Sequence, residues 1–328
     1  MGLTAADKLA LQLIQEVHRR GMRIIFDGVF NHMGLNSWAF RDVVKNQQDS
    51  PYRDWFKIKS WDDPAAGTAF AHEGWFGCYE LPEMNQDENG IVTGPREYIF
   101  AATERWMAPN GRIQDGIDGW RLDVAFCVAH PFWKAWRRHV RRINPEAYIV
   151  GELIADEDDL TPYLQGDEFD AAMNYEFAGI AAEFFIQTTE RTDAAEFDQR
   201  LRALRDKYPA QVAYVMQNLF GSHDTARMGT YIVNHDLFNY RDWTAYHHNA
   251  KAENGAPVKL RQPTDADRQI QKLFAIFQMT YVGAPMIYYG DEAGMWGDNV
   301  PCCRKPMLWP ELDYEPESYL PDGTKRET

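Results

Sequence analysis

The chain has 328 residues, of which 45% are hydrophobic and 25% are charged, values typical of a soluble globular protein. Its formal net charge of −15 disfavours nucleic acid or an anionic membrane surface as a partner. No apolar run has the length of a membrane span, and the N-terminus lacks the pattern of a signal peptide. We therefore expect a cytoplasmic protein with no nucleic-acid and no membrane partner.

The N-terminal part of the sequence predicts a helix followed by a buried strand. Residues 5–20 have the apolar spacing of an amphipathic helix, with Thr4 as its N-cap and Asp7 three residues further on. The apolar run 22–30 is typical of a strand. Residues 33–95 are rich in Gly, Asp, Pro and aromatic residues and are too long for a structureless loop, so we predict an inserted subdomain there.

Beyond residue 95, stretches typical of helices alternate with stretches typical of strands, and this order favours a parallel sheet. Helices are predicted near 96–107, 131–143 and 265–282, with further helical stretches ahead of 168–175 and through 201–208. Strands are predicted at 118–124, 147–153, 168–175, 212–220 and 284–290.

One of these strands ends with two charged residues. In "GIDGWRLDVAFCVAH", Arg121 and Asp123 lie two positions apart and therefore share one face of a strand. Buried charges need partners, so the simplest interpretation is a structural ion pair. Whether the pair has a further role depends on the residues at the ends of the other predicted strands.

Polar side chains recur where the predicted strands end, which is where an α/β barrel carries its active site; an open doubly wound sheet places its site there too. No glycine-rich phosphate loop follows any of these strands. Two chemistries fit the residue types: a metal cluster of His and carboxylates, or glycoside cleavage by paired carboxylates. The residues concerned are Asp27, Asn31, His32, Arg121, Asp123, Glu152, His223 and Asp224.

Several segments resemble, in the correct order, those of the α-amylase superfamily (glycoside hydrolase family 13). They are "DGVFNH", "LPEMN", "GWRLDVAFCV", "GELI" and "GSHD". The segments "PYLQGDEFDAAMNYEF", "GSHDTAR" and "YYGDEAGMWGDNVPCCRKPMLW" are similar to the cyclomaltodextrinase, neopullulanase and maltogenic amylase group.

The resemblance implies a (β/α)8 TIM barrel, here incomplete and comprising about strands 3 to 8. Residues 1–32 and 96–328 would form the partial catalytic barrel, and 33–95 the inserted subdomain. The first two strands and a C-terminal β-sandwich would lie outside this sequence. We therefore expect the 328-residue chain by itself to be a poor, aggregation-prone enzyme, because an incomplete barrel leaves strand edges unpaired.

By this resemblance Asp123 would be the catalytic nucleophile, Glu152 the general acid/base and Asp224 the stabiliser of the transition state. Arg121 would keep Asp123 ionised, and Asp27 would support Arg121. The substrate-binding residues implied are His32, Arg121, His223, Asn31, Asp27, Arg304, Trp75 and Phe76.

The two aromatic residues Trp75 and Phe76, together with Tyr79, would wall the glucan cleft from the inserted subdomain. An alternative is that they form the small core of that subdomain. The chain also departs from the group's pattern: Leu153 and Ile154 replace Trp and His after the acid/base.

Two further departures are Cys127, which replaces a Glu, and Val300, which replaces an acidic residue. By the resemblance these positions would surround the sugar pockets, so the sequence does not determine which substrate is preferred.

The expected function is that of a retaining glycoside hydrolase. Its substrates would be the α-1,4 bonds, and also the α-1,6 bonds, of maltooligosaccharides, cyclodextrins, pullulan or starch. The reaction would pass through a covalent glycosyl-enzyme intermediate, with transglycosylation as an additional activity. The alternatives are an α-glucanotransferase or isomerising relative, a metal-dependent barrel hydrolase, and a catalytically incompetent barrel.

We expect no required cofactor. Whether the protein binds calcium is left open, because Asn31 resembles a calcium ligand of many amylases. The partner expected is an α-glucan oligosaccharide or polysaccharide, and the full-length protein is expected to form a homodimer.

Overall fold

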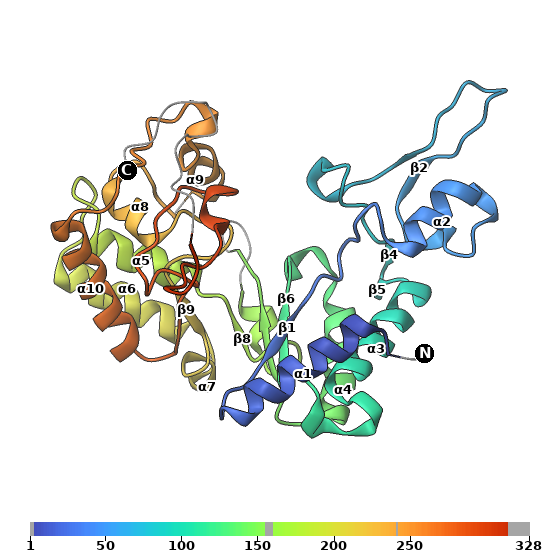
Figure 1. Cartoon of the computed structure of the whole chain (residues 1–328), viewed down its shortest axis with the longest axis horizontal. Helices are drawn as coiled ribbons and strands as arrows, with labels where there is room; N and C mark the ends of the chain where they lie inside the picture. The colour runs from blue at the N-terminus through green and yellow to red at the C-terminus, as the bar shows by residue number, and fades with distance from the viewer. Residues whose placement is uncertain (1–2, 155–159, 241, 314–328) are drawn as a thin grey trace. The chain divides into compact units, whose positions relative to one another are not determined.

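The computed structural model describes residues 3–154, 160–240 and 242–313 (Figure 1). The chain divides into two compact units, which are described separately below. The first comprises Met1–Leu153 and Pro162–Ala172, and the second Ile154–Thr161 and Met173–Thr328. Within the described ranges, no helix combines the length and apolar character needed to cross a membrane.

The first unit is built on a four-stranded parallel sheet with the order β1-β6-β7-β8. Its strands are β1 (Ile25–Gly28), β6 (Gly119–Leu122), β7 (Tyr148–Gly151) and β8 (Ala171–Ala172). The register places Asp27 of β1 beside Arg121 of β6. The predicted parallel sheet is confirmed, and its strands follow one another in chain order apart from the short strands of the inserted segment.

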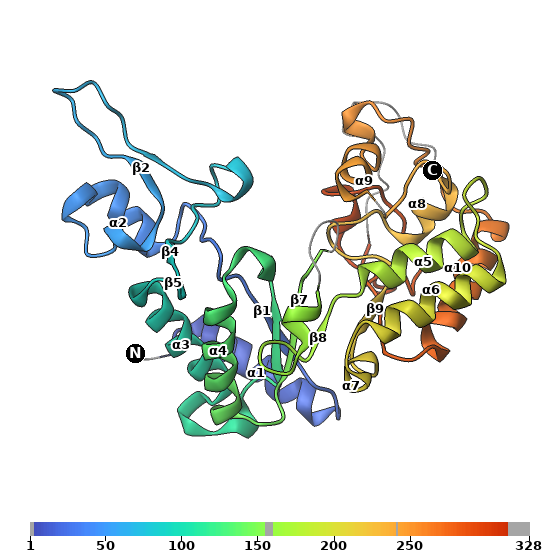
Figure 2. The same ribbon diagram turned by 180° about the vertical axis from the view of Figure 1, so that it is seen from behind.

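Three long helices accompany this sheet: α1 (Ala5–Arg19), α3 (Thr93–Met107) and α4 (His130–Ile143). The start of α1 confirms the sequence prediction, because the Thr4 hydroxyl accepts from the Asp7 backbone N–H while the Asp7 carboxylate accepts from that of Thr4. Helices α3 and α4 lie side by side in both views (Figures 1 and 2).

An aromatic cluster forms the core between the sheet and α4. The ring of Phe30 lies 6.1 Å from Trp120, 6.1 Å from Trp133 and 5.7 Å from Trp136, measured between ring centroids. The buried indole N–H of Trp136 donates to the hydroxyl of Thr103 on α3 at 2.9 Å. Burial of such large rings makes this cluster a main source of stability in the unit.

The segment between β1 and α3 has structure and a small apolar cluster of its own, formed by Ala39, Phe40, Val43 and Phe56. The predicted boundary between barrel and inserted subdomain stays a prediction. The elements are α2 (Trp38–Asn46), the antiparallel pair β2 (Ile58–Ser60) and β3 (Ala71–His72), and the antiparallel pair β4 (Gln86–Asp87) and β5 (Gly90–Ile91).

The second unit is mainly helical and also holds a parallel pair of strands. In both views α5 and α6 lie side by side (Figures 1 and 2). The helices are α5 (Tyr175–Phe185), α6 (Ala194–Asp206), α7 (Ala210–Ala213), α8 (Met228–Val233), α9 (Trp243–Asn249) and α10 (Asp265–Thr280), and the strands are β9 (Gln217–Leu219) and β10 (Ala284–Met286).

One predicted strand is largely wrong. Val212 and Ala213, which begin the predicted strand 212–220, belong to helix α7 (Ala210–Ala213), and only Gln217–Leu219 are extended. A short apolar run fits a buried helix turn and a buried strand equally well, so periodicity alone could not separate them. The described strands also do not close into a barrel: they form the sheet of the first unit, the β9–β10 pair and two short antiparallel pairs.

The close approach of β6 and β7 yields a stability prediction. A Cβ atom on Gly119 would lie 2.0 Å from the carbonyl oxygen of Tyr148 on β7, so the strands would have to shift. Gly119→Ala should lower the free energy of unfolding by about 1–3 kcal/mol, as overpacking does. Chemical denaturation measures this loss.

Gly34→Ala is the matched control, because a Cβ there meets no atom within 4 Å. Equal stability of the two variants would show that the strands accommodate the added methyl group.

Candidate active site

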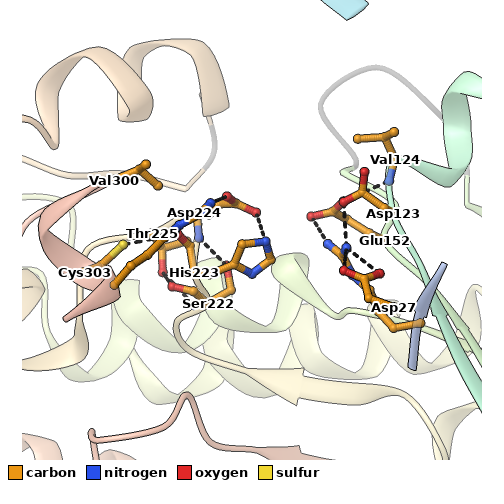
Figure 3. Close-up of polar contacts among 12 residues, drawn as sticks. Asp27, Asp123, Val124, Glu152, Ser222, His223, Asp224, Thr225, Val300 and Cys303 are labelled. Carbon is orange, nitrogen blue, oxygen red and sulfur yellow. Dashed lines mark hydrogen bonds and ion pairs between the residues drawn. The ribbon is translucent and has the colours of Figure 1, made fainter. Parts of the chain in front are cut away.

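The buried guanidinium of Arg121 is the centre of the candidate site. Its Nη1 atom donates to Asp27 at 2.8 and 2.9 Å and to Asp123 at 2.7 Å. Its Nη2 atom forms an ion pair with Glu152 Oε1 at 2.6 Å. Figure 3 shows Asp27, Asp123 and Glu152 gathered at this point. Neighbouring strands β1, β6 and β7 therefore bring together the residues that the sequence predicts at their ends.

The charges explain why this arginine can be buried. Burial by itself would lower the pKa of Arg121, but the carboxylates of Glu152, Asp27 and Asp123 outweigh burial and raise it. The guanidinium therefore stays protonated at every pH at which the protein is folded. A cation held among carboxylates in this way is a fixed part of the site.

The turn that follows Asp123 is strained and firmly held. Val124 has φ +39°, a left-handed conformation that is unusual for a β-branched residue. Its N–H donates to Glu152 Oε2 at 3.0 Å, and the next N–H, of Ala125, donates to the Glu152 carbonyl at 3.1 Å. The indole of Trp133 donates to the Ala125 carbonyl at 2.9 Å. Strain maintained by several contacts is typical of functional sites.

His32 and Asn31, which follow β1, are both buried. Burial lowers the pKa of His32, and the nearby carboxylates of Asp123 and Glu83 oppose this only in part. The His32 ring packs against Trp75, with centroids 5.6 Å apart and an angle of 27° between the planes. The predicted residues His32 and Trp75 are thus in direct contact.

The other two aromatic residues predicted at the site are largely exposed. Phe76 is 81% exposed and its ring meets Trp75 edge-on at 5.1 Å. Tyr79 is 57% exposed and packs against His72, with ring centroids 4.5 Å apart. The small apolar cluster of the inserted segment is made of other residues. A role for these rings in binding substrate stays a prediction.

A second polar cluster lies in the second unit and joins three of the predicted residues. Arg304 donates through Nη2 to Asp224 at 2.8 Å and through Nε to the carbonyl of His223 at 2.9 Å. The His223 ring pairs with Asp224 at 3.0 Å (Figure 3). The backbone N–H of Asp224 donates to the Ser222 hydroxyl at 3.1 Å, which fixes the start of the turn.

Sequence reasoning missed two residues that support the first cluster, Trp133 and Gln86, and noted Cys127 only as a departure from the pattern of the related group. Trp133 and Gln86 hold the backbone after Asp123, and Cys127 contacts Trp75. The i, i+3 and i, i+4 apolar pattern of α4 marks Trp133 as buried but does not reveal its hydrogen bond. Nothing in the sequence indicates that Gln86, which lies 41 positions from Cys127, reaches this turn.

The residues described do not assemble a metal site. Among them, no group of three or more His, Cys, Asp or Glu side chains is arranged to hold a metal ion. The buried Asn31 Oδ1 has no hydrogen-bond partner within the described ranges, so one oxygen of the type that calcium prefers is available. Calcium takes six to eight oxygen ligands, and a single amide oxygen does not supply them.

Comparison with known proteins agrees with the motifs. The profile of the alpha amylase catalytic domain matches residues 5–311. Neopullulanase 2 of Thermoactinomyces vulgaris is 40% identical over 304 residues, which are 92% of this chain and 44% of that protein. A cyclomaltodextrinase of a Bacillus species is 36% identical over 313 residues, 94% of this chain and 47% of that protein. The chain thus spans about half the length of these relatives.

Solved structures give the same result. The cyclic alpha-maltosyl-(1→6)-maltose hydrolase of Arthrobacter globiformis, in complex with its named sugar, superposes with a TM-score of 0.71 at 32% identity. The match covers 92% of this chain and 58% of that one.

The lowered pKa of His32 yields a pH prediction. Because the folded protein binds the proton less well than the unfolded chain, His32 contributes stability above its ordinary pKa of 6.5, and this is lost as pH falls through the folded pKa. The free energy of unfolding should therefore fall below pH 6.5, by at most about 1.4 kcal/mol per pH unit from this one group.

His32→Gln should flatten this slope in denaturation curves recorded between pH 8 and 5. His248→Gln, at an exposed histidine of α9, is the matched control and should keep the original slope. An unchanged slope in His32→Gln would contradict the assignment.

Proposed function

The chain belongs to the α-amylase family, as its motifs indicate, and on this premise we propose that the protein is a retaining glycoside hydrolase of α-glucans. The family is one of (β/α)8 barrel enzymes, and the parallel strands described above are compatible with part of such a barrel. The α-1,4 bonds of maltooligosaccharides, cyclodextrins, pullulan or starch are the proposed targets, with α-1,6 bonds as a second target.

One observation supports retention above all. Asp123 and Glu152 bind the two terminal nitrogens of the same guanidinium, at 2.7 and 2.6 Å. Two carboxylates that share one planar group lie close together. Retaining glycosidases keep their carboxyl groups about 5–5.5 Å apart, whereas inverting ones need roughly 6.5–9.5 Å to admit a water molecule. The shared Arg121 is compatible with the shorter spacing, and thus with direct attack by a carboxylate.

The proposed reaction has two displacements. In the first, the Asp123 carboxylate attacks the anomeric carbon while Glu152 gives a proton to the glycosidic oxygen, so that the bond to the leaving sugar breaks as the bond to Asp123 forms. In the second, Glu152 takes a proton from water, whose oxygen attacks the same carbon and releases Asp123. Two inversions restore the α-configuration.

The contacts of Glu152 add a condition to this cycle. The backbone N–H of Val124 and the Nη2 atom of Arg121 both favour a carboxylate over a carboxylic acid. The flanking Val150 and Leu153 are buried and apolar, which favours the acid. The proposed cycle requires Glu152 to carry a proton when the glycosidic oxygen reaches it.

The remaining residues have supporting roles in this proposal. Asp224 would stabilise the positive charge that develops on the sugar ring, and Arg304 would hold Asp224 in place. The two histidines His32 and His223 would donate hydrogen bonds to hydroxyls of the sugar that is cleaved. Asn31 would support His32. A cytoplasmic location and a homodimer stay predictions.

Transfer to a second sugar is the alternative outcome of the same intermediate. The acid/base Glu152 is followed by the buried, apolar Leu153, where the pattern of the related group has a Trp. Whether water or sugar enters second is read from the products: glucose and maltose alone indicate hydrolysis, and longer oligosaccharides than the substrate indicate transfer.

Removal of the proposed nucleophile tests the function. Asp123→Asn in the full-length protein should lower kcat on maltooligosaccharides by about a thousandfold or more, because the amide cannot form the covalent intermediate. Asp115→Asn, at a half-exposed carboxylate paired with the exposed Arg112, should keep near-normal turnover. NMR of the wild-type reaction should show the α-anomer first; the β-anomer first would refute retention.

Chelation tests the expected independence from metals. Because the described residues form no metal-binding group, EDTA should leave the rate of cyclodextrin cleavage unchanged. A loss of rate that added Ca²⁺ restores would reveal a required calcium ion, and one that only a transition metal restores would favour the metal-dependent alternative.

A further inference from the structure

Cys127 joins the turn after Asp123 to the inserted segment. It ends the short 3-10 turn Ala125–Cys127, and its Sγ atom accepts a hydrogen bond from the indole N–H of Trp75 at 3.3 Å. Where the pattern of the related group has a Glu, this chain has a small thiol. The side chain at this position therefore contacts a neighbouring aromatic ring.

The position of Cys127 is itself fixed. The side-chain amide of Gln86, on β4, donates through Nε2 to the Cys127 carbonyl at 2.9 Å and accepts from the N–H of Ala129 at 3.3 Å. Burial raises the pKa of the Cys127 thiol, and the hydrogen bond from Trp75 opposes this only in part, so the sulfur stays protonated. A neutral thiol on a fixed backbone is a suitable weak acceptor.

The contact with Cys127 determines the orientation of Trp75. An indole ring turns about two side-chain torsions, and here the face of Trp75 lies against His32 while its N–H end is bound to Cys127. These two contacts define the plane of the ring. Trp75 in turn supports Phe76, which meets it edge-on at 5.1 Å.

The conformation and exposure of Phe76 indicate what this arrangement is for. It has φ +47°, a costly conformation for a bulky residue, yet it is 81% exposed and gains little stability from burial. An aromatic ring held in this way next to a sugar site offers an apolar face to a sugar ring. The order of contacts runs from Cys127 through Trp75 to Phe76.

We propose that Cys127 is a positioning residue that sets the aromatic wall of the glucan site through Trp75. This inference rests on the proposed function, because it takes the ligand to be an α-glucan. Loss of the thiol should loosen Trp75 and Phe76 and weaken substrate binding, while the carboxylates of Asp123 and Glu152 keep their positions around Arg121.

The test is a double-mutant cycle on the full-length protein with maltotetraose as substrate. Cys127→Ala removes the acceptor, and Trp75→Phe removes the N–H donor but keeps a ring. Each should raise KM about three- to tenfold with kcat within twofold, as expected for the loss of one hydrogen bond that orients a binding group. The KM of the double variant should not exceed that of the single variant with the higher KM.

Two further variants sharpen the result. Cys78→Ala, at an exposed thiol of the inserted segment, should leave KM unchanged. Cys127→Ser restores an acceptor and should recover part of the affinity.

Multiplying effects on KM in the double variant, or an equal loss in kcat, would overturn the positioning role. A wild-type protein that cleaves no α-glucan would instead overturn the proposed function.

Discussion

The site depends on the burial of one cation. The Arg121 residue is 9% exposed at the end of a central strand, and a guanidinium in that position is stable only if carboxylates surround it. Strand β1 supplies Asp27 on one side, and Glu152 directly after β7 lies on the other. Asp123 directly follows β6, the strand that carries Arg121. The register of the sheet therefore serves two ends: it surrounds the buried cation with carboxylates, and it brings together the groups of the proposed site.

The turn after Asp123 is the second point where fold and site meet. A valine in the left-handed region persists because Glu152 and Trp133 bind the backbone around it. Trp133 belongs to the aromatic core of the first unit, so the core directly supports the turn that follows the proposed nucleophile, Asp123. From the other side, Gln86 of the inserted segment binds the backbone at Cys127. Catalytic groups must be held within about half an ångström, and this double support provides such rigidity.

Much of the fold could be predicted where local rules act alone. The capping box at Thr4 and Asp7 is read directly from spacing, and strand ends are marked by a change from apolar to charged residues, as where Asp123 follows Leu122. The run 212–220 could not be assigned correctly, because its apolar residues suit a helix turn as well as a strand. Tertiary contacts determine which part of it is helical and which is extended.

The candidate site was predictable by residue and in part by contact, since Arg121 was expected to act on Asp123 and to be supported by Asp27. The ion pair of Arg121 with Glu152 was not predicted, because it follows from the register of β6 and β7, which the sequence does not state. The contact between Cys127 and Trp75 joins positions 52 residues apart, and no local pattern encodes it. Such long-range side-chain contacts depend on packing of the whole unit.

The most direct measurement of the central claim is the identity of the residue that bonds to the sugar. A slow, fluorinated α-glucosyl fluoride should trap the intermediate in the full-length protein, and mass spectrometry of its peptides should locate the sugar on Asp123. Turnover with no trapped species and release of the inverted anomer, or a sugar attached to any other residue, would contradict the account.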